Sequence, residues 1–403
     1  MLVANDFDGI APILTPELTA EGIQIGLLLD TGSLLSYTIL DGSVAQGMAF
    51  LEVEAIHTQG RAVLTVVSGG GVISGIWLQS FDFLIAQPDV TATFTAESIT
   101  VGESTAWPLD GILTIPDSAS ASSPVPAVIL VHGSGPQNMD LSIFDNRPFW
   151  DIAEVLSTNG IAVLRYDKRT HAHGHRFVQT FGDHATVWDE AIEDAVLAAE
   201  ILQADERIGN VYVLGLSLGG MLAPKIAEEA GLDGAILLAG SPRPLYEIQF
   251  DQNLMAVLAA LEEGEITFEL ADIYVQFFEE QLASAEIIPH LFDFELVETT
   301  VFGIPALYHL SILHTLPLPL ISESDRRVLI LQGDRDFQVL ADTDFHIFES
   351  YTADMEHVTT ILYEGINHLF MRSQTQYNDL RDYMPPGRVD PDVLRDIVEW
   401  ILD

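Results

Sequence analysis

Hydrophobic and polar positions alternate differently on the two sides of residue 90. Before it, short apolar runs recur about every ten residues, a spacing typical of an antiparallel meander. Turn-forming glycines and aspartates separate the runs, which are Gly22–Leu29, Leu34–Leu40, Met48–Ile56, Arg61–Val67 and Val72–Leu78. We therefore predict a small β-rich domain over residues 1–89, and this segment shows no motif that carries chemistry.

Beyond residue 90 the pattern becomes one of strands and helices. Val90–Thr100 and Trp107–Ile115 favour a strand pair, and from Pro126 onward β-branched apolar runs alternate with amphipathic segments. This alternation predicts an α/β domain over residues 90–403, with a mostly parallel sheet covered by helices on both faces. The expected strands are Ala127–Val131, Ile161–Tyr166, Val211–Leu214, Gly234–Ala239, Arg327–Gln332 and Val358–Tyr363. The expected helices are Pro148–Ser157, Val187–Gln203 and Val393–Leu402.

The alternation stops between Ser241 and Asp325, where the pattern favours helices and is rich in aromatic residues. An insertion at this place, after the strand Gly234–Ala239, would lie over the edge of the sheet at which the parallel strands end. We therefore expect a helical lid over about residues 241–325. Its aromatic side chains are expected first to pack together and only second to line a substrate pocket.

One motif stands at a strand-to-helix junction. Gly215–Gly219 reads Gly-Leu-Ser-Leu-Gly, with the apolar run Val211–Leu214 before it and a segment that favours a helix after it. A G-x-S-x-G turn in this context raises the serine hydroxyl at the strand end, and its glycines avoid collisions at the sharp bend. We predict that Ser217 is a catalytic nucleophile. The alternative, a turn whose serine only caps the helix, leaves the glycines unexplained.

A serine nucleophile needs a base and an orienting carboxylate, which follow it along the chain in the order Asp or Glu, then His. His368 lies in the loop between the last expected strand and the last expected helix, from which an imidazole can reach back over the sheet edge. Gly333–Val339, after the strand Arg327–Gln332, holds two candidate carboxylates, Asp334 and Asp336. The Gly-x-x-Asp arrangement favours Asp336, although spacing alone does not separate the two.

Acyl transfer also needs donors for the negative charge that develops on the substrate carbonyl oxygen. In a turn of this kind one donor is the backbone N–H of the residue after the nucleophile, here Leu218. The second is expected in the loop after the strand Ala127–Val131, where Ser134 is the first choice and Gly135 the second. His132 opens this loop, and we interpret it as a brace of the loop and not as the base.

Composition narrows the range of partners. The chain has 60 acidic and 16 basic residues and a formal net charge of -44, and its lysines are Lys168 and Lys225. Such a charge repels nucleic acid phosphates and anionic membranes, and no apolar run reaches the ~18 residues of a membrane span. The absence of cysteine excludes disulfides and thiolate sites. The histidines of His171–His175 lack the further ligands of a zinc site, so we expect neither a metal nor a cofactor.

Segments spread over the chain carry a family resemblance. They are His132–Gln137, Asn146–Phe149, Ile161–Thr170, Gly215–Gly220, Gln332–Asp336 and Asn367–Phe370. Together they resemble the α/β-hydrolase serine esterases of the dienelactone-hydrolase-like branch, some of which carry a small domain ahead of the hydrolase. The resemblance implies an α/β-hydrolase fold, carboxylesterase activity and a triad of Ser217, Asp336 and His368. Dienelactone hydrolases themselves use cysteine where this chain has Ser217, so dienelactone is not an expected substrate.

The sequence therefore predicts a serine carboxylesterase that hydrolyses a small-molecule ester with a short to medium acyl chain through an acyl-enzyme. Its alternatives are a prolyl-oligopeptidase-like acyl-aminoacyl peptidase, an acyl thioesterase and a non-catalytic hydrolase-like binding protein. Residues 1–89 are a candidate lid, homo-oligomer contact or surface anchor. The first residues lack the features of a secretory signal, and we expect a soluble protein, either cytoplasmic or secreted after removal of a signal.

Overall fold

The computed structural model describes residues 34–45, 48–57, 60–69, 72–83 and 93–403. The chain divides into two compact units, Met1–Asp89 with Ser142–Asn146, and Val90–Leu141 with Arg147–Asp403. The change of hydrophobic pattern near residue 90 falls at the border between these units. The predicted strand Gly22–Leu29 lies outside the described residues.

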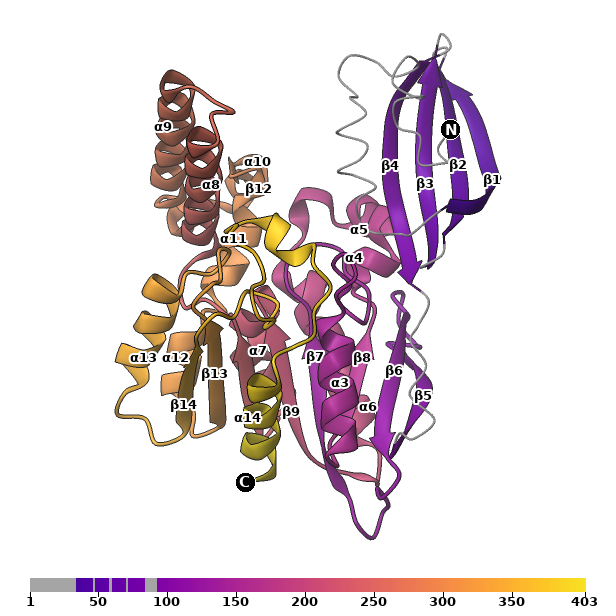
Figure 1. Cartoon of the computed structure of the whole chain (residues 1–403), viewed down its shortest axis with the longest axis vertical. Helices are drawn as coiled ribbons and strands as arrows, with labels where there is room; N and C mark the ends of the chain where they lie inside the picture. Colours follow the sequence, from indigo (N-terminus) through magenta and orange to yellow (C-terminus); the bar gives the residue numbers. More distant parts are fainter. Residues whose placement is uncertain (1–33, 46–47, 58–59, 70–71, 84–92) are drawn as a thin grey trace. The chain divides into compact units, whose positions relative to one another are not determined.

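The first unit contains a four-stranded sheet in the order β1-β2-β3-β4 (Figure 1). Its strands are β1 Leu34–Ala45, β2 Met48–His57, β3 Gly60–Gly69 and β4 Val72–Phe83. Each strand pairs antiparallel with the next one along the chain. This is the meander that the spacing of the apolar runs predicts, and each strand extends beyond the run from which it was predicted.

The second unit is built on an eight-stranded sheet in the order β14-β13-β10-β9-β7-β8-β6-β5 (Figure 1). The strands are β5 Phe94–Val101, β6 Leu109–Pro116, β7 Val125–Val131, β8 Ala162–Tyr166, β9 Ile208–Leu216, β10 Gly234–Leu238, β13 Arg327–Gly333 and β14 Val358–Tyr363. From β14 to β8 neighbouring strands are parallel, whereas β6 and β5 are antiparallel at the other edge. Because parallel strands end at one edge of a sheet, the loops that carry the predicted site residues meet there.

Helices cover both faces of this sheet (Figure 1). On one face are α3 Pro148–Thr158 and α14 Pro391–Leu402, and on the other are α6 Glu193–Gln203 and α7 Leu218–Glu229. Further helices of the described part outside the insertion include α4 Arg169–Ala172, α5 Gly174–Thr180, η3 Gly182–His184, η6 Ala341–Phe345, α13 His346–Thr352 and η7 Leu380–Tyr383. Val128 and Ile129, neighbours on β7, point to opposite faces and are both fully buried. Coverage of both faces explains why these strands read as continuous apolar runs.

One predicted helix has a different form. The segment expected as a single amphipathic helix over Val187–Gln203 begins with a π-helical turn, η4 Trp188–Ile192, which continues into α6. A π-turn changes the direction in which its side chains point and is frequent at functional sites. Glu190, in the middle of this turn, is buried, although a regular amphipathic pattern would place a carboxylate on the solvated face.

Between β10 and β13 the chain forms the helical insertion that the sequence predicts. Its elements are α8 Leu245–Glu262, α9 Phe268–Ala285, η5 Ile288–His290, α10 Asp293–Glu298, β11 Thr300–Val301, β12 Ile304–Pro305, α11 Ala306–Leu313 and α12 Pro317–Ser322. The helices α8 and α9 form a hairpin that projects away from the sheet (Figure 1). The two-stranded pair β11 and β12 was not expected from the sequence.

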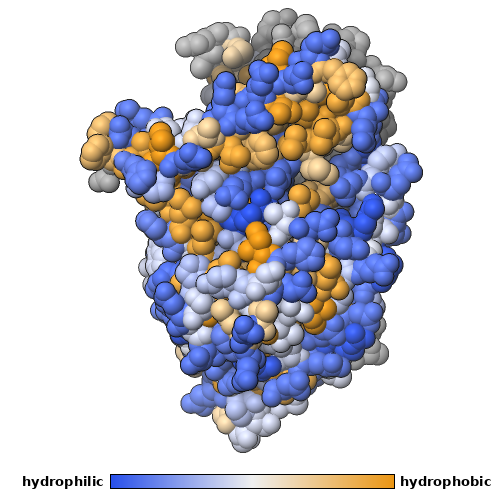
Figure 2. All heavy atoms as spheres, turned by 90° about the vertical axis from the view of Figure 1, so that its left-hand side faces the viewer, coloured by the Kyte–Doolittle hydropathy of each residue, from blue (hydrophilic) through white to orange (hydrophobic). Residues whose placement is uncertain are grey.

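The aromatic residues of the insertion divide between packing and exposure. Phe278 is buried in a cluster with Val257 and Ala271, as expected. Phe292 and Phe294 stack on each other but are 70% and 66% exposed, which the expectation of internal packing did not anticipate. Figure 2 shows further apolar side chains at the surface of the molecular face that carries α8 and α9.

Candidate active site

The predicted nucleophile stands on a strained turn between β9 and α7. Ser217 has a φ of 57° and a ψ of -118°, a conformation that costs energy for a residue with a side chain. A Cβ at Gly215 would lie 2.0 Å from Gly219 O, and a Cβ at Gly219 would lie 2.2 Å from Val131 O. Both glycines of the motif are therefore required by close backbone approach, as the sequence predicts. The Ser217 N–H donates to Leu238 O at 2.8 Å, which ties the turn to β10.

Two other predicted residues meet at the same edge of the sheet. Asp336 follows β13 and His368 follows β14, and His368 Nδ1 lies 2.7 Å from Asp336 Oδ2. Both side chains are almost fully buried. A carboxylate accepts, so Nδ1 carries the proton of this hydrogen bond and Nε2 is left as the free basic nitrogen of the neutral imidazole.

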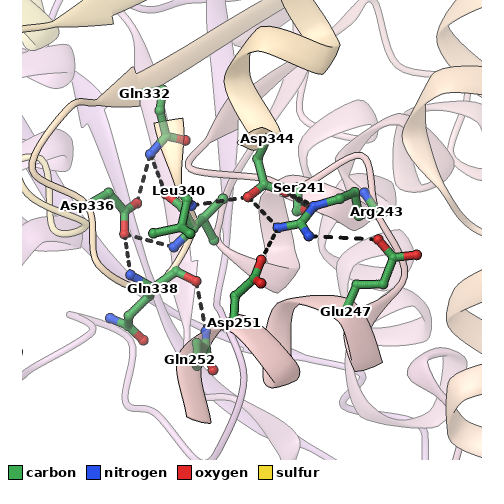
Figure 3. A network of polar contacts seen from close by, with 11 residues as sticks. Ser241, Arg243, Glu247, Asp251, Gln252, Gln332, Asp336, Gln338, Leu340 and Asp344 are labelled. Atoms are coloured by element: carbon green, nitrogen blue, oxygen red, sulfur yellow. Dashed lines mark hydrogen bonds and ion pairs between the residues drawn. The ribbon is translucent and has the colours of Figure 1, made fainter. Parts of the chain in front are cut away.

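The Asp336 carboxylate is anchored by the residues around it (Figure 3). Oδ1 accepts from the backbone N–H groups of Gln338 and Val339 at 2.8 Å and 2.9 Å. Oδ2 accepts from Gln332 Nε2 at 2.9 Å in addition to His368. With these four donors every acceptor position of an ionised carboxylate is in use. The orientation of Asp336 is therefore determined by several contacts at once.

The competing carboxylate, Asp334, has a different partner. It is exposed, and its Oδ1 accepts from the Gly365 N–H at 2.6 Å. This contact joins the loop after β13 to the loop after β14. Of the two candidates that spacing left open, Asp336 is the one in contact with His368.

The loop that carries His368 is held by a network that the sequence analysis missed. Asn367 Oδ1 accepts from the N–H groups of Leu369 and Met371 at 3.1 Å and 3.2 Å. Asn367 Nδ2 donates to the buried Asp382 at 2.9 Å. Asn367 thus stabilises the turn next to the histidine, and the pattern of the sequence offered no signal for its partner fifteen residues further on.

The nucleophile and the predicted oxyanion loop lie side by side. A Cβ at Gly133 would come within 3.1 Å of Ser217 Cβ, so the backbone of the loop after β7 directly borders the serine. Ser217 itself is half-buried, and within residues 93–403 its hydroxyl forms no direct hydrogen bond with His368. Leu218, whose N–H is the other predicted donor, begins α7, where the first N–H groups of a helix lack partners within the helix.

His132 has the role of a brace. Its Nε2 lies 2.9 Å from Asn138 O, and its ring packs against Phe149 and Tyr166. Burial, reinforced by the positive charge of Lys168, lowers the pKa of His132 to about 3. The ring is therefore neutral at physiological pH, and Nε2 donates to the carbonyl.

A buried lysine, to which the sequence pattern assigned no role, contacts the predicted oxyanion loop. Lys168 Nζ lies 2.6 Å from Gly133 O and 2.5 Å from Glu190 Oε1. Its neighbours Asp167 and Arg169, considered above only as members of a matching segment, brace the structure in a similar way. Asp167 Oδ1 accepts from the Met139 N–H at 2.8 Å, and Arg169 forms a buried ion pair with Asp194.

The insertion is tied to the Asp336 loop by a second ionic cluster (Figure 3). Arg243 lies just ahead of α8 and forms a two-pronged contact with the buried Asp344, with both distances 2.9 Å. Asp344 Oδ2 also accepts from the Leu340 N–H at 3.1 Å. Gln252 on α8 donates to Gln338 O at 2.9 Å. These contacts reach the backbone of the loop but not the Asp336 carboxylate.

The histidine-rich segment after β8 makes ordinary contacts. His173 Nε2 lies 2.8 Å from Pro108 O, and His175 lies next to Gln179. Across the residues that the structure describes, no three or more His, Cys, Asp or Glu side chains converge as ligands of a metal ion would. None of the helices in the described ranges has both the length and the apolar character needed to cross a membrane.

Comparison with known proteins assigns the fold. The family model described as "Alpha/beta hydrolase family" matches residues 128–380, which is more than half of the chain. The chain belongs to the alpha/beta hydrolase family. This assignment confirms the predicted fold. The candidate site of this hydrolase is built on the parallel sheet and the turn at Ser217, and the insertion follows β10.

Individual relatives of this alpha/beta hydrolase include esterases and a peptidase. Esterase EstD of Thermotoga maritima is 37% identical over 295 residues, which are 73% of this chain and 65% of EstD, so the chain spans less than two thirds of that relative's length. Acylaminoacyl peptidase of Pyrococcus horikoshii matches with a TM-score of 0.50 at 12% identity, over 91% of this chain and 56% of the peptidase. Est1E from Butyrivibrio proteoclasticus has a TM-score of 0.46 at 14% identity, over 76% of this chain and 98% of Est1E. The structural likenesses concern the fold alone.

Proposed function

We propose that this hydrolase is a serine carboxylesterase with Ser217, Asp336 and His368 as its triad. The observation that carries the proposal is the 2.7 Å contact between His368 Nδ1 and Asp336 Oδ2. This contact joins the two loops in which chain order places the orienting carboxylate and the general base that act on the serine of a G-x-S-x-G turn. The name of the relative EstD, an esterase, supports the ester as the substrate class.

In the acylation step, His368 Nε2 takes the proton of the Ser217 hydroxyl as its oxygen attacks the ester carbonyl carbon. The carbonyl π electrons move to the oxygen, which becomes an oxyanion in a tetrahedral intermediate. Asp336 stabilises the imidazolium through Nδ1–H and does not itself take the proton. When the intermediate collapses, the alkoxide leaves with the proton from His368, and the acyl group stays on Ser217.

In the deacylation step a water molecule takes the place of the alcohol. His368 removes a proton from the water, whose oxygen attacks the acyl carbon, and the proton then passes to Ser217 as the carboxylic acid leaves. In both steps the backbone N–H groups of Leu218 and Ser134 donate to the oxyanion. Removal of one preorganised donor of this kind typically lowers kcat by about 10²- to 10³-fold.

The experiment is the Ser217→Ala variant assayed on p-nitrophenyl acetate, butyrate and octanoate. We expect kcat to fall by about three to six orders of magnitude, because the nucleophile of the acyl-enzyme is lost. A fluorophosphonate probe should label the unchanged protein once per chain and leave Ser217→Ala unlabelled. Rates that decline from butyrate to octanoate would support the proposed preference for short to medium acyl chains.

The matched control is Ser284→Ala on α9, where an exposed serine donates only to the backbone oxygen of Glu280. Its activity and labelling should equal those of the unchanged protein. Aminoacyl p-nitroanilides and acyl thioesters, assayed in parallel, test the peptidase and thioesterase alternatives. Faster turnover of either class than of every ester, or esterase activity that survives Ser217→Ala, would contradict the proposal.

A further inference from the structure

Lys168 occupies an unusual place for a lysine in this chain. It is one of two lysines in a protein with a formal net charge of -44, and its side chain is only 2% exposed. Lys168 follows β8 at the sheet edge where the candidate site lies. Its Nζ lies between two acceptors, Gly133 O at 2.6 Å and Glu190 Oε1 at 2.5 Å. Placing an ammonium group away from water is costly unless its protons find acceptors.

The contact with Gly133 O has a consequence for the neighbouring residue. The Gly133 carbonyl and the Ser134 N–H belong to one planar trans peptide, so they point in opposite directions. Holding the carbonyl toward Lys168 therefore turns the Ser134 N–H to the side away from Lys168. Gly133 borders Ser217, so the orientation of this peptide determines where the N–H lies relative to the reacting carbonyl.

Gly133 is buried beside Ser217, but the chain that follows it has few restraints. Ser134, Gly135 and Pro136 are exposed, and Gly135 has a φ of +82°, a conformation that glycine adopts without strain. Within residues 93–403, the segment 133–136 takes part in one hydrogen bond, which Lys168 donates to Gly133 O. On its Ser134 side the peptide has no packed neighbour, so the hydrogen bond from Lys168 to Gly133 O is the contact that opposes its rotation.

Two further side chains hold Lys168 in place. Glu190, a buried residue of the π-turn, binds Lys168 with Oε1 and accepts from the Tyr308 hydroxyl with Oε2. Burial, and then the negative charge of Glu190, raise the pKa of Tyr308 well above its usual value, so the hydroxyl keeps its proton and donates. Tyr308 lies on α11 of the insertion, and Ser311 on the same helix accepts from the Val187 N–H at 3.1 Å.

These contacts form a connected path from the insertion to the loop that borders the predicted nucleophile. It runs from Tyr308 through Glu190 and Lys168 to the Gly133 peptide. A buried ion pair is weak evidence for a stabilising role, because apolar side chains of similar volume often replace such a pair without loss of stability. What an apolar replacement does not provide is a donor to Gly133 O.

We infer that Lys168 is a positioning residue, which turns the Ser134 N–H toward the oxyanion, and that Glu190 and Tyr308 hold it there. The inference rests on the proposed function, since it names the device that prepares one of the two proposed oxyanion donors. It also assigns the insertion a part in the chemical step, because Tyr308 belongs to α11. The expected defect of a disturbed path is poorer stabilisation of the oxyanion with unchanged binding of the ester.

The test is the double variant Lys168→Met with Glu190→Gln, which removes both charges together and so leaves no unpaired ion in the interior. We expect kcat to fall about 10- to 100-fold and KM to stay within about threefold, because a misdirected donor acts only on the transition state. A trifluoromethyl ketone, whose hemiketal oxyanion occupies the same position, should bind more weakly by the same factor as kcat falls. Fluorophosphonate labelling of Ser217 should still go to completion.

The matched control is Lys225→Met, the same change at the other lysine. Lys225 lies on the surface of α7 and pairs with Glu228 and Glu229, so kcat and ketone binding should not change. A double variant that equals this control in both measurements would overturn the inference. So would a loss of ketone affinity no larger than the change in KM, because it would indicate general disorder of the site.

Tyr308→Phe tests the path without changing any charge. Losing only the hydroxyl, it should lower kcat about two- to tenfold with KM unchanged, the size expected for one indirect hydrogen bond. If the double variant does not fold, an unchanged kcat and ketone affinity in Tyr308→Phe overturn the inference. Failure of the proposed function looks different, because Ser217 would then not react with the fluorophosphonate in the unaltered protein.

Discussion

The two sides of the candidate site are held in different ways. The Asp336 carboxylate accepts four hydrogen bonds, one from His368 and three from donors within residues 332–339. Gly133 O, on the other side, accepts one from Lys168. Lys168 in turn depends on Glu190, 22 residues away, and Glu190 on Tyr308, a further 118 residues away. The donors to Asp336 are close together in the sequence and act in parallel, because each contacts the carboxylate directly. The residues behind Gly133 are far apart in the sequence and act in series, because each contacts only the next one.

This difference predicts different tolerance to change. Donors that act in parallel can be lost one at a time, because the remaining donors keep the carboxylate in place. Links that act in series are more sensitive, because each residue depends on the one before it and the loss of one disturbs those that follow. The insertion contacts both sides, but on the Asp336 side its contacts, from Arg243 to Asp344 and from Gln252 to Gln338 O, do not reach the Asp336 carboxylate. On the oxyanion side it is the first link of the path.

The largest expected effect comes from changing Asp336 itself, the carboxylate that accepts the four hydrogen bonds. Asp336→Asn should lower kcat about 10⁴-fold, because an amide can hold the wrong imidazole tautomer and cannot stabilise the imidazolium. KM should change little. Steady-state kinetics on p-nitrophenyl butyrate measure both constants.

The matched control is Asp334→Asn, two residues earlier in the same loop. Asp334 contacts Gly365 and not His368, so kcat should stay within about twofold of the unchanged value, as is usual for an exposed position. If Asp334→Asn were the more damaging of the two, Asp336 would not be the orienting carboxylate.

The local half of the site is also the half that the sequence predicts best. Ser217, Asp336 and His368 follow from a turn motif, from chain order and from the ends of apolar strands, all of which are visible as short patterns. The glycines around Ser217 could be predicted because the bend itself demands them. Asp334 and Asp336 could not be separated, because a two-residue spacing does not say which carboxylate turns inward.

The distant half was not predictable in the same way. The contact of Lys168 with Gly133 requires knowing that β8 lies next to β7 in the sheet. The contact with Glu190 requires the π-turn, whereas the pattern over Val187–Gln203 predicts a regular amphipathic helix. Nothing in the spacing joins Tyr308, in an insertion read as packing and pocket wall, to a residue on the π-turn. Such pairs depend on tertiary structure, which a one-dimensional pattern does not contain.

The second prediction concerns the free energy of unfolding and its dependence on pH through His132, at the start of the loop after β7. The pKa of His132 is lowered to about 3 in the folded chain, whereas an unfolded histidine titrates near 6.5. As the pH falls, the unfolded state therefore binds a proton before the folded state does. The contribution of neutral His132 to the free energy of unfolding is fully present above pH ~6.5 and is lost as the pH falls toward 3. Between pH 7 and pH 5 the loss should be about 2 kcal/mol.

His132→Gln isolates this contribution, because its amide can still donate to Asn138 O but does not titrate. The stability advantage of the unchanged protein over the variant should shrink by about 2 kcal/mol from pH 7 to pH 5. Denaturant unfolding at both pH values measures it, above the isoelectric point of about 4.2. The control His175→Gln changes an exposed histidine, and its difference in unfolding free energy from the unchanged protein should be the same at both pH values. If this difference shrank equally for both variants, His132 would not be the group that causes the pH dependence.

The smallest expected effect sharpens the contrast between parallel and serial support. Gln332→Met removes one of the four donors to Asp336, and the two backbone N–H groups and His368 remain. We expect kcat to fall less than about tenfold, which is below the ~1.5–3 kcal/mol of one hydrogen bond to a charged group, because the three remaining donors keep the carboxylate in place. Gln338→Met is the control, since its side chain donates to Tyr383 and its backbone N–H still reaches Asp336. A loss in Gln332→Met as large as in the Lys168→Met and Glu190→Gln double variant would show that the four donors do not act independently, and the contrast would fail.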